Sequence, residues 1–394
     1  MKTAFIKAKS ITMMLGLLLA GVSAREAQGQ SVVGTCVQGT QYPTIQAAVN
    51  AAPSGSTIKV CPGGYPEQVV IEKPLTLEGI TSAGAEGAWV LPPTTGWAAT
   101  DPTSSNTAQL LVKNTTGVTI SNLIVDAANN AAQCRAGLTG VLFHNASGTA
   151  NKLAIRNQLT IESAIQCNGY GLVAEVDNQQ AQTVAVQNSD FRNNGYWSLV
   201  AAGTGMTMNA LNNFVTGGDN SQIGGAGIVY YVGATGTAQG NTVTNEIDTY
   251  GSVGPAMTNS TGIAVNCASA TVQSNVITNT QLGIYVGCFV QGHSSGISTV
   301  TQNKILYTKI ADGIYVSAPG NSITKNTVVA SASSGIHLDT ALGGINNTVS
   351  GNTVTETCIG ILTSGTVGSN TLSANTFNDV YIPTEKGTAC TPIF

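Results

Sequence analysis

Two tyrosines, a histidine and two aspartates in the last third of the chain could together carry acid–base chemistry on a sugar. Tyr285, Tyr315 and His337 each follow the isoleucine of a Gly-Ile pair. Asp339 lies two residues after His337, and Asp312 directly precedes one of the pairs. A histidine beside carboxylates exchanges protons near neutral pH, and stacked aromatic faces suit sugar rings. We predict catalytic roles for His337, Asp339 and Asp312, with substrate contacts from the two tyrosines. The alternative is a hydrated strand face with an incidental histidine.

Acidic residues nearer the N-terminus could hold a cation. Glu175 and Asp177 are two residues apart, which places both on one side of a strand. Because carboxylate oxygens are preferred ligands of Ca²⁺, we predict a metal site at this pair. Asp126, Glu162 and Arg192 occupy corresponding places in three successive repeats of the chain. They could belong to a cation site as well, although a stacked ladder of ion pairs is the interpretation that we favour.

These residues can meet only if a regular repeat brings distant parts of the chain together. One phrase recurs through the second half: an apolar residue, two further residues and an asparagine, with looser copies before it. Successive asparagines are 23 to 35 residues apart, and a Gly-Ile pair follows most of them. The repeat asparagines are Asn122, Asn157, Asn188, Asn213, Asn241, Asn275, Asn303, Asn326, Asn352 and Asn375.

The repeat predicts an all-β fold, a right-handed single-stranded parallel β-helix. Short strands would alternate inward apolar residues with outward ones, and one coil alone cannot bury its inner face. Coils stacked about 4.8 Å apart would bury a continuous core and pair their backbones. Asparagines at one corner would form a side-chain ladder, and glycines would permit the backbone angles of the corners. A leucine-rich repeat would need more leucine, and a β-sandwich would not keep this register.

Two lysines could add a positive charge to a binding site. Lys304 and Lys325 each lie next to a repeat asparagine, on coils that the repeat makes neighbours. We predict that they contact a carboxylate of a substrate. Solvated surface lysines are the alternative.

The N-terminus has the three parts of a signal peptide. Three lysines precede a 12-residue apolar run, and small residues follow at 22–24. We assign 1–24 to a signal peptide, 25–56 to an N-terminal segment with a capping helix, 57–380 to the β-helix and 381–394 to a C-terminal tail or cap. Thr44 is the expected N-cap of that helix, which Pro53 and Gly55 should end. The apolar run is short for a membrane span, so none is expected in the mature chain; a retained N-terminal anchor is the alternative.

The charge balance argues against some classes of partner. Only 9% of the residues are charged, and after residue 24 there are 12 Lys and Arg against 19 Asp and Glu, a net charge of −7. A nucleic-acid binder needs a basic face, so no nucleic-acid partner is expected. A polyanionic substrate would be repelled unless a metal or a local basic cluster intervened. The expected location is secreted, periplasmic or at the cell surface.

Eight cysteines in an exported chain indicate four disulfides. Cys267 and Cys288 each lie five residues after the glycine of a Gly-Ile pair, so they should sit on adjacent coils at a distance that suits a disulfide. Similar spacing after two repeat asparagines pairs two earlier cysteines, and the remaining four would tie down the ends. The predicted pairs are Cys36–Cys61, Cys134–Cys167, Cys267–Cys288 and Cys358–Cys390.

The chain resembles the pectin lyase-like superfamily of right-handed parallel β-helix proteins. The segment TIQAAVNAAPSGSTIKV (44–60), followed by GYPEQVVIEKPLTL (64–77), looks like the opening of pectin methylesterases. It also looks like many bacterial β-helix proteins, including periplasmic ones of the nitrous-oxide-reductase maturation type. The resemblance covers nearly all of the mature chain and implies the fold. It does not supply a reaction, because the catalytic motifs of the esterases, pectate lyases, polygalacturonases and alginate epimerases have no match here.

Two functions remain open at this point. In polysaccharide lyases of this fold, carboxylates commonly hold Ca²⁺, which acidifies the proton beside a uronate carboxyl, so Ca²⁺ is the cofactor that the resemblance suggests. Three histidines are few for a copper-binding cluster. The missing motifs favour an exported, non-catalytic protein that binds glycans or acts as a scaffold. The Tyr-His-Asp group favours a carbohydrate-active enzyme, a polysaccharide lyase, hydrolase or epimerase, and a polysaccharide is the expected partner in either case.

Overall fold

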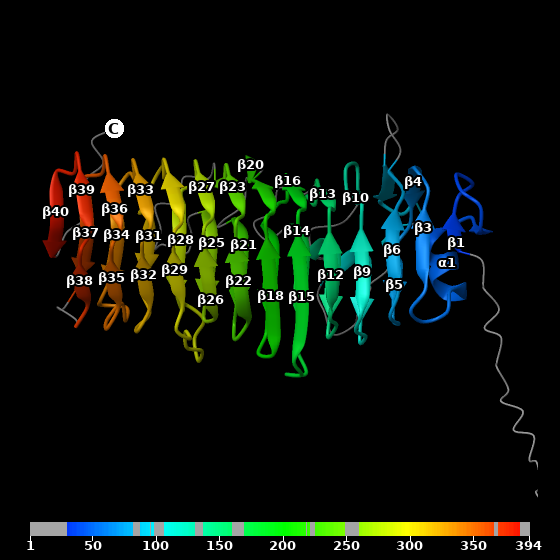
Figure 1. Ribbon diagram of the computed structural model, residues 1–394, viewed down its shortest axis with the longest axis horizontal. Coiled ribbons are helices and arrows are strands. Elements are labelled where there is room, and N and C mark those ends of the chain that lie inside the picture. The colour runs from blue at the N-terminus through cyan, green and yellow to red at the C-terminus, as the bar shows by residue number, and fades with distance from the viewer. Residues whose placement is uncertain are drawn as a thin grey trace, which may run out of the picture.

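The chain folds as a right-handed parallel β-helix, as the repeat predicts. The computed structural model describes residues 30–81, 87–94, 96–97, 106–130, 137–159, 169–217, 219–220, 225–248, 260–365 and 369–386. Within them the strands form three parallel sheets, A, B and C, of 14, 12 and 12 strands, plus the small pair β20 (Asp219–Asn220) and β24 (Ile247–Asp248). The coils follow one another along the long axis from the N-terminal to the C-terminal end (Figure 1).

Each full coil adds one strand to each sheet, in the order A, B, C. Sheet A contains β1 (Ser31–Val33), β2 (Thr40–Tyr42), β3 (Thr57–Val60), β6 (Thr76–Gly79), β9 (Val118–Ser121), β12 (Gly148–Asn151), β15 (Gln182–Gln187), β18 (Met206–Leu211), β22 (Thr235–Gln239), β26 (Ser269–Gln273), β29 (Thr299–Thr301), β32 (Ser322–Thr324), β35 (Thr348–Ser350) and β38 (Thr371–Ser373). Sheet B contains β4 (Gly63–Pro66), β7 (Ala88–Leu91), β10 (Leu123–Asp126), β13 (Ala154–Arg156), β16 (Asp190–Arg192), β19 (Phe214–Thr216), β23 (Thr242–Thr244), β27 (Val276–Thr278), β30 (Lys304–Leu306), β33 (Thr327–Val329), β36 (Thr353–Thr355) and β39 (Thr376–Asn378). Sheet C contains β5 (Val69–Ile71), β8 (Asn106–Lys113), β11 (Gly137–His144), β14 (Gly169–Glu175), β17 (Trp197–Ala202), β21 (Ala226–Tyr231), β25 (Thr261–Asn266), β28 (Leu282–Gly287), β31 (Ile314–Val316), β34 (Ser334–Asp339), β37 (Ile359–Ser364) and β40 (Ile382–Lys386).

The core follows from the period-2 pattern of very short strands. In β29, β32 and β35 the central residues Val300, Ile323 and Val349 are fully buried and lie in register, while their neighbours face outward. β-branched side chains fit such a pleated surface, and burying each one contributes about 1.5–3 kcal/mol. The core is therefore a column of stacked apolar side chains that each coil extends.

A ladder of buried asparagines runs along the corner between sheets A and B. The backbone N–H and side-chain N–H of Asn303 both donate to Oδ1 of Asn326 on the next coil, at 3.0 and 2.9 Å. Its side chain also donates to the carbonyl of Val272 at 2.8 Å. The same pattern links each member to the next in the series Asn213, Asn241, Asn275, Asn303, Asn326, Asn352 and Asn375. The predicted ladder is confirmed for these seven residues.

The three earliest repeat asparagines do not belong to this ladder. Asn122 and Asn188 lie one position before the ladder position, where the backbone is left-handed with φ of 55° and 52°. Asn157 lies at a different corner, after sheet B, also with a left-handed φ of 58°. Asparagine tolerates the left-handed region better than other side-chain-bearing residues, so it marks more than one kind of corner. Assigning these three to one column was wrong.

The glycine of each Gly-Ile pair is needed for packing rather than for its backbone angles. Gly313 and Gly335 do not have the left-handed φ that other corner residues adopt. A Cβ on Gly313 would lie 2.3 Å from Cγ1 of Val328 and 2.6 Å from the carbonyl oxygen of Gly335. The expected role of these glycines is therefore corrected: they let sheet C approach sheet B and the next coil.

A short helix, α1 (Ile45–Ala51), forms where the sequence predicts one, and Thr44 is its N-cap. The side chain of Gln46 accepts from the N–H of Val70 at 2.7 Å and donates to its carbonyl at 3.2 Å. Val70 is in β5, the first strand of sheet C. The side-chain amide of Gln46 therefore forms hydrogen bonds with the backbone N–H and carbonyl of Val70, which a preceding strand would otherwise bond. That α1 caps the β-helix stays a prediction. In the part of the chain that is described, no helix has the length and apolar character to cross a membrane.

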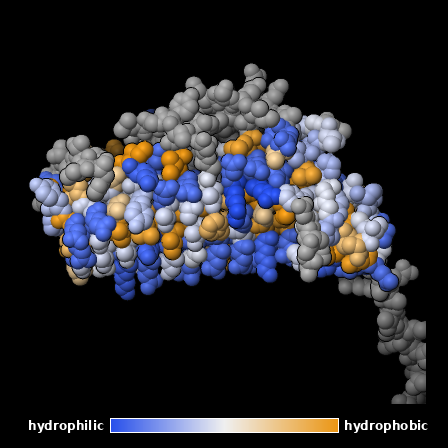
Figure 2. All heavy atoms as spheres, turned by 90° about the horizontal axis from the view of Figure 1, so that it is seen from above, coloured by the Kyte–Doolittle hydropathy of each residue, from blue (hydrophilic) through white to orange (hydrophobic). Residues whose placement is uncertain are grey.

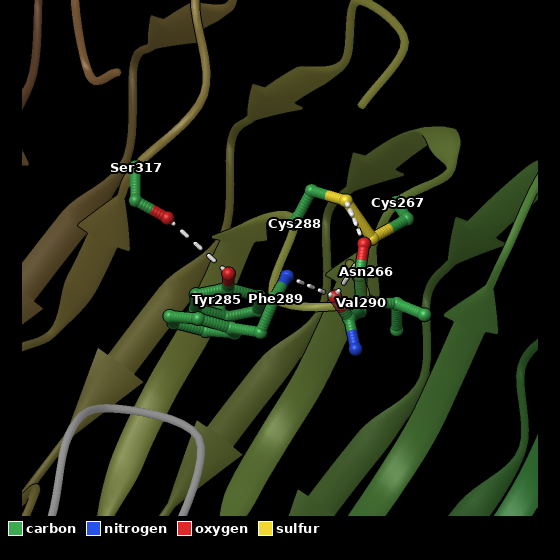
Figure 3. The surroundings of a disulfide bond; sticks show 7 residues. All are labelled: Asn266, Cys267, Tyr285, Cys288, Phe289, Val290 and Ser317. Carbon is green, nitrogen blue, oxygen red and sulfur yellow. Dashed lines mark hydrogen bonds between the residues drawn. A yellow bond between two sulfur atoms is a disulfide. The ribbon is translucent and has the colours of Figure 1, made fainter. Parts of the chain in front are cut away.

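Two of the predicted disulfides are present in the described residues. Cys36 and Cys61 are bonded with their Cα atoms 5.6 Å apart, and Cys267 and Cys288 with theirs 4.2 Å apart (Figure 3). The second pair joins the ends of β25 and β28 on neighbouring coils, as the Gly-Ile register predicts. Cys358 is also disulfide-bonded. Several predictions stay untested because their residues lie outside the described part of the chain. They concern the pair Cys134–Cys167, the predicted partner Cys390 of Cys358, the acidic residue Glu162 and the signal peptide at 1–24.

Candidate functional site

The predicted column of aromatic residues and histidine forms on sheet C. Tyr285, Tyr315 and His337 are register partners on β28, β31 and β34. The two tyrosine rings stack with centroids 5.9 Å apart, and the Tyr315 ring meets the imidazole edge to face at 4.9 Å. Phe289 stacks on Tyr285 at 5.0 Å (Figure 3). The coil register thus places these side chains as the sequence indicates.

The column is covered, so the tyrosines do not offer an open face to a sugar. Tyr285 is 1% exposed and Tyr315 is 7% exposed. The hydroxyl of Tyr285 lies 3.2 Å from that of Ser317, and the hydroxyl of Tyr315 donates to Asp339 at 2.6 Å. Burial raises the pKa of both tyrosines, so both hydroxyls stay protonated. The predicted substrate contacts from these two residues are corrected: they face outward from the core but are packed under neighbouring side chains.

His337 is held between an aspartate and a serine from the coils on either side. Its Nδ1 lies 3.0 Å from Oδ2 of Asp312, and its Nε2 lies 2.7 Å from Oγ of Ser364. The hydroxyl and backbone N–H of Ser334 donate to the other oxygen of Asp312 at 2.5 and 3.0 Å. His337 and Asp312 therefore meet as predicted, whereas Asp339 bonds to Tyr315 instead of the histidine. Ser364 completes the group and was not among the predicted residues.

Asp312 is ionised in this setting. Burial raises the pKa of its carboxyl, but the hydrogen bond and charge of His337 and the two hydrogen bonds from Ser334 outweigh it, and the pKa lies below its usual value. An ionised carboxylate can only accept hydrogen bonds, so Nδ1 of His337 carries a proton. In the neutral imidazole, Nε2 is then the free base that accepts from Ser364.

The predicted Ca²⁺ pair, Glu175 and Asp177, converges on a histidine and an asparagine. Oε1 of Glu175 lies 2.9 Å from Nδ1 of His144, and Oδ2 of Asp177 lies 3.5 Å from its Nε2. Asn145 donates to Asp177 at 2.7 Å and accepts from its backbone N–H at 3.1 Å. The pair thus builds an ion-pair network around the buried His144, and the described residues contain no group of three or more His, Cys, Asp or Glu side chains that could hold a metal ion, so the metal assignment is not supported.

The charged corners nearer the N-terminus form two separate ion pairs within the described residues. Asp126, Arg156 and Arg192 are register partners on β10, β13 and β16. Arg156 pairs with Asp126 at 2.9 Å and its guanidinium lies 4.4 Å from the ring centroid of Trp89. Arg192 pairs with Asp190 on its own strand at 2.7 Å. The predicted ladder of Asp126, Glu162 and Arg192 stays a prediction, because Glu162 lies outside the described residues and Arg192 pairs within its own strand.

The two predicted substrate lysines lie away from the histidine. Lys304 is the first residue of β30, and Lys325 lies in the turn between β32 and β33, and both are exposed. Lys304 pairs in register with Thr327, so the lysines do not share a column. Both lie at the corner of sheets A and B, whereas His337 is on sheet C. The structure does not bring the two lysines to the histidine site.

A groove at the corner of sheets B and C was not predicted. It has a volume of about 590 Å³ and crosses the last four coils. Tyr307 and Tyr381, which are 53% and 80% exposed, stand at its two ends. Between them lie the small side chains of Ala330 and Ala332, and Lys309, Glu356 and Asp379 supply charges.

The sequence contains the signal for this groove. Tyr307, Ala330, Glu356 and Asp379 each lie four residues after a ladder asparagine, and all four have left-handed φ between 49° and 57°. The lining residues Lys309, Ala332, Cys358 and Tyr381 lie six residues after the same asparagines. Counting from the asparagines instead of the Gly-Ile pairs would have aligned these residues in two columns, whereas their exposure and the groove itself come from the structure. Figure 2 shows hydrophobic residues interspersed with hydrophilic ones along the face that it displays.

The solved structures that the chain resembles share its fold at low sequence identity. A GH136 lacto-N-biosidase from Eubacterium ramulus aligns with a TM-score of 0.58 and 12% identity, covering 86% of this chain. The chain spans only 64% of that enzyme's length. DFA-IIIase from Arthrobacter chlorophenolicus A6, without its lid and in complex with GF2, aligns with a TM-score of 0.53 and 15% identity over 89% of this chain and 99% of that one. No curated protein sequence matches the chain.

A protein-family model does match. The model described as "Periplasmic copper-binding protein (NosD)" covers residues 181–389. Within the described residues, no group of three or more His, Cys, Asp or Glu side chains is arranged to hold a metal ion. His144 and His337 are each bonded to carboxylates, and the described cysteines are in disulfides. These side chains do not fit copper, which favours free imidazole and thiolate or thioether ligands. The match nevertheless extends over more than half of the 394 residues, and the protein therefore belongs to the NosD family.

Proposed function

We propose that this protein is an exported β-helix protein that binds a glycan in the groove between Tyr307 and Tyr381. The observation that carries the proposal is a pair of exposed aromatic rings at the two ends of an apolar floor. Sugar rings pack their C–H faces on aromatic side chains while neighbouring polar groups bond their hydroxyls. Lys309, Glu356 and Asp379 would supply those polar groups.

The length of the groove suits an oligosaccharide. Hydrogen bonds between successive turns, from Tyr307 to Val329 and from Ala330 to Thr355, place one coil directly beside the next. Tyr307 and Tyr381 are three coils apart, which is about 14 Å at about 4.8 Å per coil. A ligand that contacts both rings must therefore be longer than one sugar ring.

Cleavage of a glycosidic bond is the second candidate function. Glu356 and Asp379 hold the same position on neighbouring coils and both line the groove, and paired carboxylates are what glycoside hydrolysis uses. Both side chains are exposed to water, however. A general acid usually needs a water-poor setting that keeps it protonated, so binding without cleavage is the better-supported function.

We infer export from three observations. The family is described as periplasmic, the chain contains disulfides, and the first 24 residues have the pattern of a signal peptide. The proposed location is the periplasm or the cell surface, where a stable β-helix would meet polysaccharides. Mass spectrometry of the exported protein should find Arg25 at the N-terminus, and a mature chain that still carries residues 1–24 would contradict the assignment.

The proposal is tested by titrating the purified protein with a panel of neutral and acidic oligosaccharides in a calorimeter. We expect Tyr307→Ala and Tyr381→Ala each to weaken binding about 10-fold or more, which is about 1.4 kcal/mol. Phe214→Ala is the matched control, because Phe214 is an exposed aromatic residue on β19 outside the groove.

Two outcomes would count against binding in the groove. No binding across the panel, or unchanged affinity in the double tyrosine variant, would overturn the proposal. The same samples are assayed for new reducing ends. Their release by the wild type, and its loss in Glu356→Gln or Asp379→Asn, would replace binding with cleavage as the function of this groove.

A further inference from the structure

We propose that Ser364 acts as a nucleophile, His337 as a general base and Asp312 as the carboxylate that positions this base, in the hydrolysis of esters of short carboxylic acids. This activity is independent of the groove, which lies at the corner of sheets B and C. The three residues lie on three successive coils: Asp312 precedes β31, His337 is within β34, and Ser364 is the last residue of β37. The register of the coils brings them together although 52 residues separate the first from the last.

The hydrogen bonds have the polarity that nucleophilic catalysis requires. The carboxylate of Asp312 lies 3.0 Å from Nδ1 of His337, and Nε2 lies 2.7 Å from Oγ of Ser364. In the neutral imidazole whose Nδ1 donates to the carboxylate, Nε2 presents a lone pair to the serine hydroxyl. A nucleophile within hydrogen-bond reach of a base, with the base oriented by a third group, is the arrangement that activates serine.

The surroundings hold the imidazole and the carboxylate in place but leave the serine nearest to the surface. Ser334 holds Asp312 with two hydrogen bonds, and the edge-to-face contact with Tyr315 fixes the imidazole plane. The side chain of Asp312 is 7% exposed and that of His337 is 13% exposed. Ser364 is half-buried, and the exposed Gly365 follows it with a left-handed φ of 89°. The burial of the imidazole leaves little room, so only a small acyl group can reach Oγ of Ser364.

Another serine on the same face lacks the base. Ser317 occupies the matching position two coils earlier, but its hydroxyl lies 3.2 Å from that of Tyr285. Burial raises the pKa of Tyr285, so that partner is a protonated phenol and not a base. Only Ser364 of these two serines is paired with an imidazole, which makes Ser317 a matched control.

The reaction balances with the ester and water alone. Oγ of Ser364 attacks the ester carbonyl carbon, and its proton passes to Nε2 of His337. The C–O bond to the alcohol then breaks, and the alcohol leaves with that proton, which gives an acyl-serine. Water gives a proton to Nε2 and attacks the acyl carbon. The bond to Oγ then breaks while Nε2 returns that proton to Oγ, which releases the carboxylic acid and restores the serine hydroxyl.

The first test is covalent labelling of the full exported chain. A fluorophosphonate probe, which phosphonylates activated serines, is expected to add once, and peptide mass spectrometry is expected to place the adduct on Ser364. Labelling should be lost in Ser364→Ala and in His337→Gln, and should be kept in Ser317→Ala. An adduct on any other residue, or none on Ser364 in the wild type, would overturn the proposal.

The second test is hydrolysis of p-nitrophenyl acetate. We expect Ser364→Ala to lower kcat by about 10³-fold or more, down to the background rate. Asp312→Asn should lower kcat about 10²-fold or more with KM unchanged, because the imidazole then loses the acceptor that fixes its protonated nitrogen. A merely structural Asp312 would instead change KM and the melting temperature together. The proposal would be contradicted if the wild type and Ser364→Ala hydrolysed the ester at the same rate while circular dichroism showed both proteins to be folded.

Discussion

At the scale of single residues, one buried carboxyl forms no ion pair with any other described residue. Glu246 is 1% exposed, and its Oε1 has no hydrogen-bond partner in the described part of the chain. Burial raises the pKa of this side chain to about 8. The folded chain therefore holds a proton that the unfolded chain releases above about pH 4.5, and the stability contributed at this residue falls as the pH rises from about 4.5 to 8.

Replacing Glu246 with glutamine should remove this dependence. We expect Glu246→Gln to raise the free energy of unfolding at pH 9 by a few kcal/mol, roughly, and to change it little at pH 5. Urea unfolding at the two pH values measures the difference, and Glu356→Gln, at an exposed carboxyl, is the control. An equal effect of Glu246→Gln at both pH values would show that the carboxyl is not protonated in the folded state.

The residue scale also shows why the candidate site was only partly predictable. The Gly-Ile register correctly aligned Tyr285, Tyr315 and His337, because residues at equal spacing stack on neighbouring coils. It did not reveal that Tyr315 would form a hydrogen bond with Asp339, or that Ser364 would form one with His337. Those choices depend on rotamers and on diagonal contacts between strands, which sequence spacing does not contain.

At the scale of elements, the asparagine ladder fixes where each coil turns from sheet A to sheet B. Each inner member satisfies its own side chain and the backbone N–H groups of the turn. A buried amide group without a hydrogen-bond partner lowers the free energy of unfolding by about 1–3 kcal/mol. Removing one ladder asparagine would leave such groups on its neighbours.

We expect Asn303→Ala to lower the free energy of unfolding by about 1–3 kcal/mol. The variant removes acceptors from the backbone and side-chain N–H groups of Asn275. Asn209→Ala on the outward face of β18 should change stability by less than about 0.5 kcal/mol. Equal costs for the two variants, measured by chemical unfolding, would mean that the ladder does not stabilise the coils.

At the scale of the whole molecule, the fold is a one-dimensional stack in which each coil contacts mainly its neighbours. Strand pairing runs from coil to coil in every sheet, from the first coils to the last (Figure 1). The stability of such a stack is approximately a sum over coils and their interfaces. A whole coil is therefore a removable unit, whereas part of a coil is not.

Deleting residues 326–351 should leave a folded protein that is one coil shorter. The junction joins Lys325 to Asn352, which restores a ladder asparagine after a left-handed residue. We expect an unchanged β-type circular dichroism spectrum and cooperative unfolding, with loss of the ester hydrolysis that needs His337. Deleting only residues 326–338 breaks the register and should prevent folding. If both deletions fold equally well, the coil is not the structural unit.

The sequence by itself determined the architecture, the later ladder asparagines and the Cys267–Cys288 link. These follow from period and side-chain type, because apolar alternation and equal spacing place residues of one kind on the same face of successive coils. Only the tertiary structure decided that the tyrosines are covered, that Glu175 and Asp177 enclose His144, that Ser364 meets His337, and that Tyr307 and Tyr381 bound a groove. Exposure and pairing depend on which side chains the corners and neighbouring coils place around a residue, and repeat spacing carries no information about that.

The assignment of Asn122, Asn157 and Asn188 to the ladder was wrong for a related reason. The left-handed turns at two different corners favour asparagine, as the buried ladder also does.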